Sequence, residues 1–418
     1  MKRSMPLCLI AALLCIQACT FLPGAEPTPT PLPASTTAAP VPTDSPPTLP
    51  RVTAERFCGD GICDGPENAE TCPQDCATTA VRTEEATRPT PHPTRQPTVD
   101  ASQPVPPVYV TIAGHIEDTP VYARCEAYTG YRENLLLWAE AVHGAGAAVN
   151  LQIDYEFFAG ASRCETPELR NATTGGENVI HYLATRLGFE IDAHQEGGWE
   201  EGADNYADVR FLGETVTPAI SDNVGGLVWD DPEQFARLAQ GETGWMTPDY
   251  TWYPQVLTLA VSRDHHLGDF SADDVASGVW QPAGAGRRFW VHDPDAPLVY
   301  VGPGEHSNWD AARPQQSTPE FVHTLVRGLR EGTLDRDRMY TASIAVPQSI
   351  IFDPERHSEL LAIFDQLAPL IESDAAKYVT YSQAVDVWRS EYDAGPNVFF
   401  RDGVEHPADV HRASTSAE

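Results

Sequence analysis

The chain has 418 residues and a formal net charge of -33 at pH 7, with 60 acidic side chains against 27 Lys and Arg. The excess acid is spread along the chain rather than gathered in one block, and such a surface repels phosphate backbones. Composition therefore argues against a nucleic-acid partner, while the length allows more than one domain.

Residues 1–19 have the features of a bacterial export signal. A Lys-Arg start is followed by an apolar run that ends near Ile16, which is too short to span a membrane. The ending "IQAC" resembles a lipobox, although Gln17 stands where a small residue is usual, and it predicts lipidation of Cys19. A plain secretory signal is the alternative. We expect an exported lipoprotein of the cell membrane that faces the extracytoplasmic side.

Two segments, 20–55 and 78–106, consist largely of Pro, Thr, Ala and Ser. They have too few apolar residues to offset the loss of chain entropy on folding, so we expect extended linkers. Residues 396–418 form a C-terminal tail. The linkers would hold a folded head away from a membrane or cell wall.

A small Cys-rich module, residues 56–77, lies between the linkers. Its four cysteines are Cys58, Cys63, Cys72 and Cys76. In an exported chain, cysteines this close predict two disulfides, whose pairing the sequence does not specify. Acidic side chains alternate there with glycines, so calcium is a candidate ligand of the module.

In the large region 107–395, segments with strand character alternate with segments of helical periodicity. The predicted strands are 108–114, 148–154, 189–195, 226–231, 297–304 and 339–347, and the predicted helices are 131–146, 175–188, 232–241, 318–332, 356–373 and the end of 376–392. Such alternation indicates parallel strands with helical crossovers. We expect an α/β fold, a (β/α) barrel of six or seven units. A doubly wound sheet is the alternative, but it is disfavoured because no Gly-rich phosphate loop follows the first strand.

Acidic and His side chains follow several of these strands. The clusters are His115, Glu117 and Asp118; Asp154 and Glu156; Asp192, His194 and Glu196; Asp230 and Asp231; and Glu305 and His306. The carboxyl ends of barrel strands meet at one end of the barrel, so we expect the clusters to converge there. His and carboxylate side chains are ligands of divalent ions, although any one cluster alone would read as a charged turn.

Further predictions concern cysteines and aromatic residues of this region. Cys125 and Cys164 are expected to form a disulfide, because each follows one of the first two strands of an exported domain. The stretch 199–255 shows few regular patterns and is expected to form long loops around a cleft. Aromatic side chains there and nearby are candidates to stack on sugars, with at least half packed under loops; they are Trp199, Trp229, Trp245, Tyr250, Trp252, Tyr253, Trp280 and Trp309.

The order of "GHIED", "NLQIDYEFF", "FEIDAHQEGG" and "KYVTYSQAVDVWRSEY" resembles the polysaccharide deacetylase (NodB-homology) superfamily, in a divergent exported form, over about 108–392. The resemblance implies a distorted, seven-stranded α/β barrel that binds a divalent ion, often zinc. By position, it assigns Asp118 to the metal, Glu117 to the catalytic base and His194 to the metal.

Two departures from the family pattern change the expected ligand set. The chain has Glu-Asp where the family has Asp-Asp, and Glu196 stands where a second His would follow His194. Positions 194 and 196 of a strand point to the same side, so both can bind one ion. His115 or Glu196 would complete the metal set, and His306 is the expected late acid.

The predicted function is metal-dependent deacetylation of an acetylated cell-wall or extracellular polysaccharide. The ion would polarise the acetyl carbonyl and activate water, Glu117 would take the proton, and His306 would protonate the leaving group. One alternative is a glycoside hydrolase with paired carboxylates, such as Glu117 with Asp192 or Glu196. Another is a carbohydrate-binding barrel without turnover. The sequence names neither the sugar nor the oligomeric state.

Overall fold

The computed structural model describes residues 104–117, 120–195, 205–263, 276–304, 318–396 and 399–400. They belong to one of the two units into which the chain divides, Pro93–Glu418. The predicted signal with Cys19, the linkers, the Cys-rich module and most of the C-terminal tail lie outside these residues.

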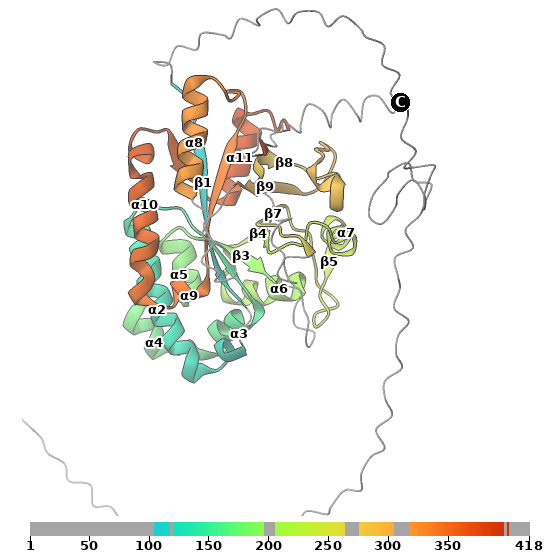
Figure 1. Cartoon of the computed structure of the whole chain (residues 1–418). Coiled ribbons are helices and arrows are strands. Elements are labelled where there is room, and N and C mark those ends of the chain that lie inside the picture. Colours follow the sequence, from blue (N-terminus) through green and yellow to red (C-terminus); the bar gives the residue numbers. More distant parts are fainter. Residues whose placement is uncertain are drawn as a thin grey trace, which may run out of the picture. The chain divides into compact units, whose positions relative to one another are not determined.

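A parallel sheet forms the centre of this unit (Figure 1). In order of pairing, its strands are β10 (Tyr340–Val346), β1 (Val108–Ile116), β2 (Asn150–Ile153), β3 (Glu190–His194), β4 (Ile220–Gly225), β7 (Val256–Thr258) and β9 (Val299–Pro303). Within the described ranges, each neighbouring pair of these seven strands runs parallel.

Short strands extend this sheet at its edges. β8 (Ala276–Trp280) pairs antiparallel with β9, and β12 (Phe399–Phe400) pairs antiparallel with β8. β11 (Ala376–Tyr378) runs parallel to the first residues of β1, while β2 pairs with its last residues. A separate hairpin is made by β5 (Glu242–Thr243) and β6 (Thr251–Trp252).

Side-chain hydrogen bonds close this sheet into a barrel between β10 and the β8–β9 pair. The backbone N–H of Thr341 donates to Ser277 Oγ at 2.8 Å, and Ser277 Oγ donates to the Thr341 carbonyl at 2.7 Å. Thr341 Oγ1 donates to the Gly302 carbonyl at 2.6 Å and accepts from the Gly278 N–H, also at 2.6 Å. The predicted distorted α/β barrel is confirmed; seven neighbouring strands of its sheet run parallel, and antiparallel β8 takes part in the closure.

The helices connect the strands. They are α2 (Cys125–Gly144), α3 (Tyr155–Cys164), α4 (Pro167–Thr173), α5 (Val179–Arg186), α6 (Tyr206–Val216), α7 (Pro232–Gln240), α8 (Thr318–Glu331), α9 (Gln348–Ile351), α10 (His357–Glu372) and α11 (Tyr381–Glu391), with short 3-10 turns η1 (Pro120–Ala123), η3 (Gly286–Trp290) and η4 (Pro354–Arg356). Several begin at a polar cap that satisfies a free backbone N–H. Asp154 accepts from Phe157 N at 2.9 Å in α3, and Thr380 forms a capping box with Gln383 in α11.

Helix α11 covers the amino-terminal end of the barrel. Its buried residues Tyr381, Val385 and Trp388 share an apolar cluster with Tyr109 and Val256, which lie at the starts of β1 and β7. The opposite, carboxyl-terminal end of the strands is therefore the end left for chemistry. None of the described helices is long and apolar enough to cross a membrane.

Two sequence predictions in the middle of the chain are wrong. Segment 226–231 is not a strand, because Val228 makes only an isolated bridge to Val261, and the strand is Ile220–Gly225 just before it. Segment 199–255 is not a set of long loops, since its described part holds α6, β4, α7 and the β5–β6 hairpin. The helical period of α6 is interrupted in the sequence because polar Asp208 and Arg210 are among its buried residues.

The predicted disulfide is confirmed, because Cys125 and Cys164 are bonded with an S–S distance of 2.01 Å. It joins the start of α2 to the end of α3. Among the described aromatic candidates, Trp252 and Trp280 are buried, and Trp245 and Tyr253 are exposed at 57% and 64%. Trp229 and Tyr250 are partly buried against the core, so at least half pack as expected.

Candidate functional site

Three predicted site residues meet at the carboxyl-terminal end of the barrel. His115 is the penultimate residue of β1, Glu117 follows that strand directly, and His194 is the last residue of β3. One ligand atom from each side chain lies within 4.8 Å of the others. The fold thus brings together residues from the "GHIED" and "DAHQE" stretches, which are far apart in the chain.

Both imidazoles approach the same carboxylate oxygen. His194 Nε2 lies 2.5 Å from Glu117 Oε2, and His115 Nδ1 lies 3.6 Å from it. The two rings stand nearly perpendicular, with centroids 5.0 Å apart. His194 is nearly buried, with 3% of its side chain exposed, whereas Glu117 at 24% is open to solvent. The cluster is therefore reachable from the end of the barrel.

The electrostatics of the cluster favour an ionised carboxylate. Burial of Glu117 opposes ionisation, but hydrogen bonds and charge from His115 and His194 outweigh it and hold the pKa of this carboxyl well below its ordinary value. Glu117 is accordingly an anion at neutral pH. An anionic oxygen between two imidazole nitrogens is an arrangement that attracts a cation.

Gln348, the first residue of α9, fixes the position of Glu117. Gln348 Oε1 accepts a hydrogen bond from the Glu117 backbone N–H at 3.3 Å and another from the Tyr122 hydroxyl. Tyr122 lies in η1, shortly before the disulfide-bonded Cys125. The chain that leaves β1 is thus fixed close to the cluster.

His194 packs against a glycine that its position requires. Gly226 has a φ of 78°, and a Cβ there would lie 2.6 Å from Cε1 and 3.0 Å from Nδ1 of His194. The Nδ1 atom of His194 is buried and has no hydrogen-bond partner among the described residues.

The donor set fits a divalent cation. Two imidazoles and one carboxylate with a further position open are the ligand types of catalytic zinc sites. The close approach of all three donor atoms agrees with this chemistry. His115, Glu117 and His194 are the residues that would hold such an ion.

The remaining predicted site residues, Asp118, Glu196 and His306, lie outside the described residues, as does Glu305. Their predicted roles as ligands or acid therefore stay predictions. Glu117, predicted as the base, lies within the cluster itself.

Other polar clusters from the sequence serve the fold instead. Asp154 caps α3, and Asp231 caps α7 by accepting from Glu233 N at 2.9 Å. Asp230 accepts from the Arg263 backbone N–H at 2.7 Å. Such residues look the same in sequence as a catalytic carboxylate, because helices of a barrel begin where its strands end.

Asp192 lies inside the barrel, on the same face of β3 as His194 but two positions nearer the start of the strand. Its side chain is fully buried and accepts hydrogen bonds from the neutral groups of Ser221, Asn150 and Asn223. Burial, with a smaller contribution from the nearby Glu190, raises the pKa of this carboxyl well above its ordinary value. A buried carboxylate of this kind does not suit the glycosidase pair Glu117 and Asp192.

Sequence reasoning missed the residues beside the cluster inside the barrel. Gln152 of β2 and Thr258 of β7 are fully buried there, and Gly225 of β4 pairs with His194. One signal was present: a Gln within the otherwise apolar strand "NLQI", and a Gly-Gly pair directly after "SDNV".

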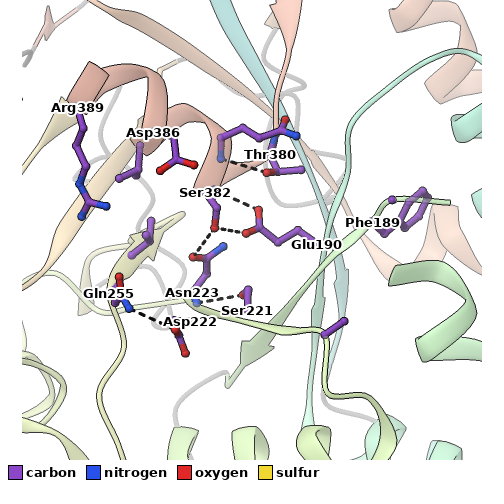
Figure 2. A pocket seen from close by; sticks show the side chains of 15 residues that line it. Phe189, Glu190, Ser221, Asp222, Asn223, Gln255, Thr380, Ser382, Asp386 and Arg389 are labelled. Carbon is purple, nitrogen blue, oxygen red and sulfur yellow. Dashed lines mark hydrogen bonds between the residues drawn. The ribbon is translucent and has the colours of Figure 1, made fainter. Parts of the chain in front are cut away.

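A pocket of about 390 Å³ lies at the opposite end of the strands, where β3, β4 and β7 begin. Figure 2 shows Ser382 of α11 pointing between Glu190 and Asn223. Ser382 donates to Glu190 from its backbone N–H at 3.2 Å and from its hydroxyl. These contacts bind α11 to the sheet. Barrel enzymes place their chemistry at the carboxyl-terminal end, so the His cluster and not this pocket is the candidate site.

No family model and no curated protein matches the chain. Several solved structures are similar to it at a low level, among them the following three. A putative polysaccharide deacetylase from Mycobacterium smegmatis is 12% identical, with a TM-score of 0.38 over 72% of this chain and 98% of that one. A probable polysaccharide deacetylase from Pseudomonas aeruginosa PAO1 is 11% identical, with a TM-score of 0.41 over 68% and 92%. Puue allantoinase is 12% identical, with a TM-score of 0.42 over 73% and 99%. Structural similarity at this level supports no conclusion about activity.

Proposed function

We propose that the protein is a metal-dependent hydrolase that removes acetyl groups from a cell-wall or extracellular polysaccharide, with zinc as the ion. The observation that carries the proposal is the convergence of His115, Glu117 and His194 at the carboxyl-terminal end of the barrel. Glycoside hydrolysis by the pair Glu117 and Asp192 is less well supported, because Asp192 is buried among neutral hydrogen-bond donors, and the pair Glu117 and Glu196 stays a prediction.

The chain's own residues have distinct tasks in this proposal. His194 is nearly buried and lies on the inner side of the site, and the more exposed Glu117 lies on its solvent side. Gln348 fixes the backbone of Glu117 by accepting a hydrogen bond from its N–H. A bound zinc ion supplies a Lewis acid for an acetyl carbonyl and a water of lowered pKa. With Glu117 in the ligand set, Asp118 becomes the proposed base, and His306 remains the proposed acid.

We also propose that the protein works outside the cytoplasm, tethered through lipidated Cys19 and its linkers. The Cys125–Cys164 disulfide supports an oxidising compartment, where such bonds form and persist. A calcium-binding role for the Cys-rich module remains a proposal from sequence alone.

Metal content of the purified protein tests the proposal. After dialysis against zinc and removal of loosely bound metal, elemental analysis should find zinc in the wild-type chain and much less in His115→Ala and His194→Ala. His323→Ala is the matched control, because His323 is exposed on α8 and distant in sequence from the cluster. Wild-type protein that retains no zinc, or that releases no acetate from acetylated polysaccharides or chitin oligosaccharides, would refute the proposed function.

The Glu117→Gln variant separates the two roles considered for this residue. As a ligand, Glu117 contributes directly to ion affinity, so the variant should lose zinc. As a base only, it acts on bound water, so the variant would retain zinc and lose hydrolysis. The second outcome would return the base role to Glu117 and the ligand role to Asp118.

A further inference from the structure

We propose that Gln152 is a further functional residue of the site, whose side-chain carbonyl accepts a hydrogen bond from a donor bound there. The donor is a water molecule or the amide N–H of an acetamido group. This inference rests on the proposed function and names the chemical group that the inner part of the site recognises.

Gln152 lies on the same face of the sheet as the cluster. It pairs in register with His115 of β1 on one side and with Asp192 of β3 on the other. Partner residues in parallel strands point to the same face, and His194 points as Asp192 does because it lies two positions further on. Gln152 therefore projects into the barrel between the two strands that carry the histidines.

The hydrogen bonds of Gln152 fix the direction of its amide. Its Nε2 donates to Thr258 Oγ1 at 2.7 Å, and Thr258 Oγ1 donates its own proton to the Val224 carbonyl at 3.0 Å. A hydroxyl has one proton to give, so Thr258 can only accept from Gln152. The amide nitrogen must face Thr258, and the carbonyl oxygen must face the other way.

That carbonyl oxygen is buried and has no hydrogen-bond partner among the described residues. Gln152 itself is 0% exposed. Buried polar atoms in folded proteins are nearly always paired, so an unpaired carbonyl on the face of the sheet that carries the cluster indicates a missing ligand.

The Gln152 amide has room because residue 225 is a glycine and has no side chain. Gly225 pairs in register with His194 and with Thr258. A Cβ at Gly225 would lie 2.3 Å from the amide carbon and oxygen of Gln152. Only glycine leaves room for the amide at this level of the barrel, immediately next to the strand end that carries His194.

A carbonyl oxygen can only accept, which limits what it recognises. At the scissile bond itself the available donors are the attacking water and, for an N-acetyl substrate, the amide N–H. A hydrogen bond from the water would orient its lone pair towards the acetyl carbon. A hydrogen bond from the amide would favour N-acetyl over O-acetyl groups, because an ester oxygen has no proton to give.

The test compares Gln152→Met with Gln234→Met in the otherwise intact chain. Methionine has a similar length and no carbonyl. Gln234 is the matched control, because it is also buried but its Oε1 accepts from the Val228 N–H at 2.8 Å. Melting of the zinc-free protein, zinc content, and acetate release from chitin oligosaccharides and from p-nitrophenyl acetate are measured for both variants.

Gln152→Met should keep its zinc and lose less melting temperature than Gln234→Met. It gives up the bond to Thr258 together with an unpaired carbonyl, and Thr258 still donates to Val224, whereas Gln234→Met leaves the Val228 N–H without its acceptor. Acetate release from the chitin oligosaccharides should fall at least about tenfold, the effect of losing about 1.4 kcal/mol of transition-state stabilisation. An equal fall with the ester identifies water as the donor, and an unchanged ester rate identifies a donor of the acetylated sugar, of which the amide N–H is the one at the scissile bond.

Two results overturn the inference: wild-type rates on both substrates in Gln152→Met, or a loss of melting temperature as large as that of Gln234→Met. If the wild-type chain binds no zinc or hydrolyses neither substrate, the proposed function fails instead. The melting comparison then still decides whether the Gln152 carbonyl is unpaired.

Discussion

Replacing Gly226 by alanine should weaken metal binding by displacing His194, and the structure gives the size of the effect. The φ of 78° costs a residue with a Cβ about 1–2 kcal/mol of folding free energy. The new Cβ would also stand 2.6 Å from His194 Cε1 and 2.9 Å from the Gln195 carbonyl oxygen, so the ring must move. Changes that reorient a ligand histidine typically reduce metal affinity by about 10–100-fold.

The measurement is a zinc titration against a competing chelator, together with urea denaturation of the zinc-free protein. Gly146→Ala is the control, because Gly146 has a nearly equal φ of 74° but no atom within 4 Å of its Cβ position. Gly146→Ala should lose about 1–2 kcal/mol of stability, and Gly226→Ala more, because only its Cβ meets other atoms. Only Gly226→Ala should lose zinc affinity. Equal zinc affinity in the two variants would show that His194 is not a ligand held by this contact.

Three further predictions concern stability. Replacing Cys125 and Cys164 by serine should cost about 4 kcal/mol of unfolding free energy, from the 39-residue separation of the bridged cysteines, and urea melts that match wild type would contradict this. Arg132→Met should cost up to about 3–5 kcal/mol, because the buried Glu165 carboxylate loses its 2.5 Å partner and keeps only Arg170 at 3.7 Å and the Tyr128 hydroxyl; the exposed pair Arg186–Glu177 is the control and should tolerate Arg186→Met without a measurable change. In zinc-free protein, the stabilisation from Glu117 should be complete above its unfolded pKa of about 4.3 and disappear as the pH falls towards its lowered folded pKa. Denaturation of wild type and Glu117→Gln across pH would test this, and a difference that grows in acid would refute it.

The sequence predicted the elements whose pattern is long and regular. The alternating β-branched residues of β1 and β10 and the apolar stripes of α8 and α10 were placed correctly. The three-residue strand β7 was missed because so short a segment has no period to recognise. Helix α6 was missed because Asp208 is buried, and its carboxylate accepts from the backbone N–H groups of Trp245, Met246 and Thr247.

The candidate site was predictable in its residue types but not in its geometry. His115, Glu117 and His194 stand in the two stretches singled out from the sequence. Asp154 and Asp231 have the same position after a strand, and only the structure shows that they cap helices. The unpaired carbonyl of Gln152 depends on register with Thr258 and Gly225, which are more than 70 residues away in the chain and leave no local pattern.

The way the barrel closes has a consequence for its dynamics. Ser277 and Thr341 are 64 residues apart, and their hydroxyls join strands that share no backbone ladder. We expect a junction of so few bonds to open before the parallel ladders do. The Gly278 amide, which donates to Thr341 Oγ1, therefore reports by its hydrogen exchange on a partial opening of the ring. The amides between β1 and β10 report on unfolding of the whole sheet.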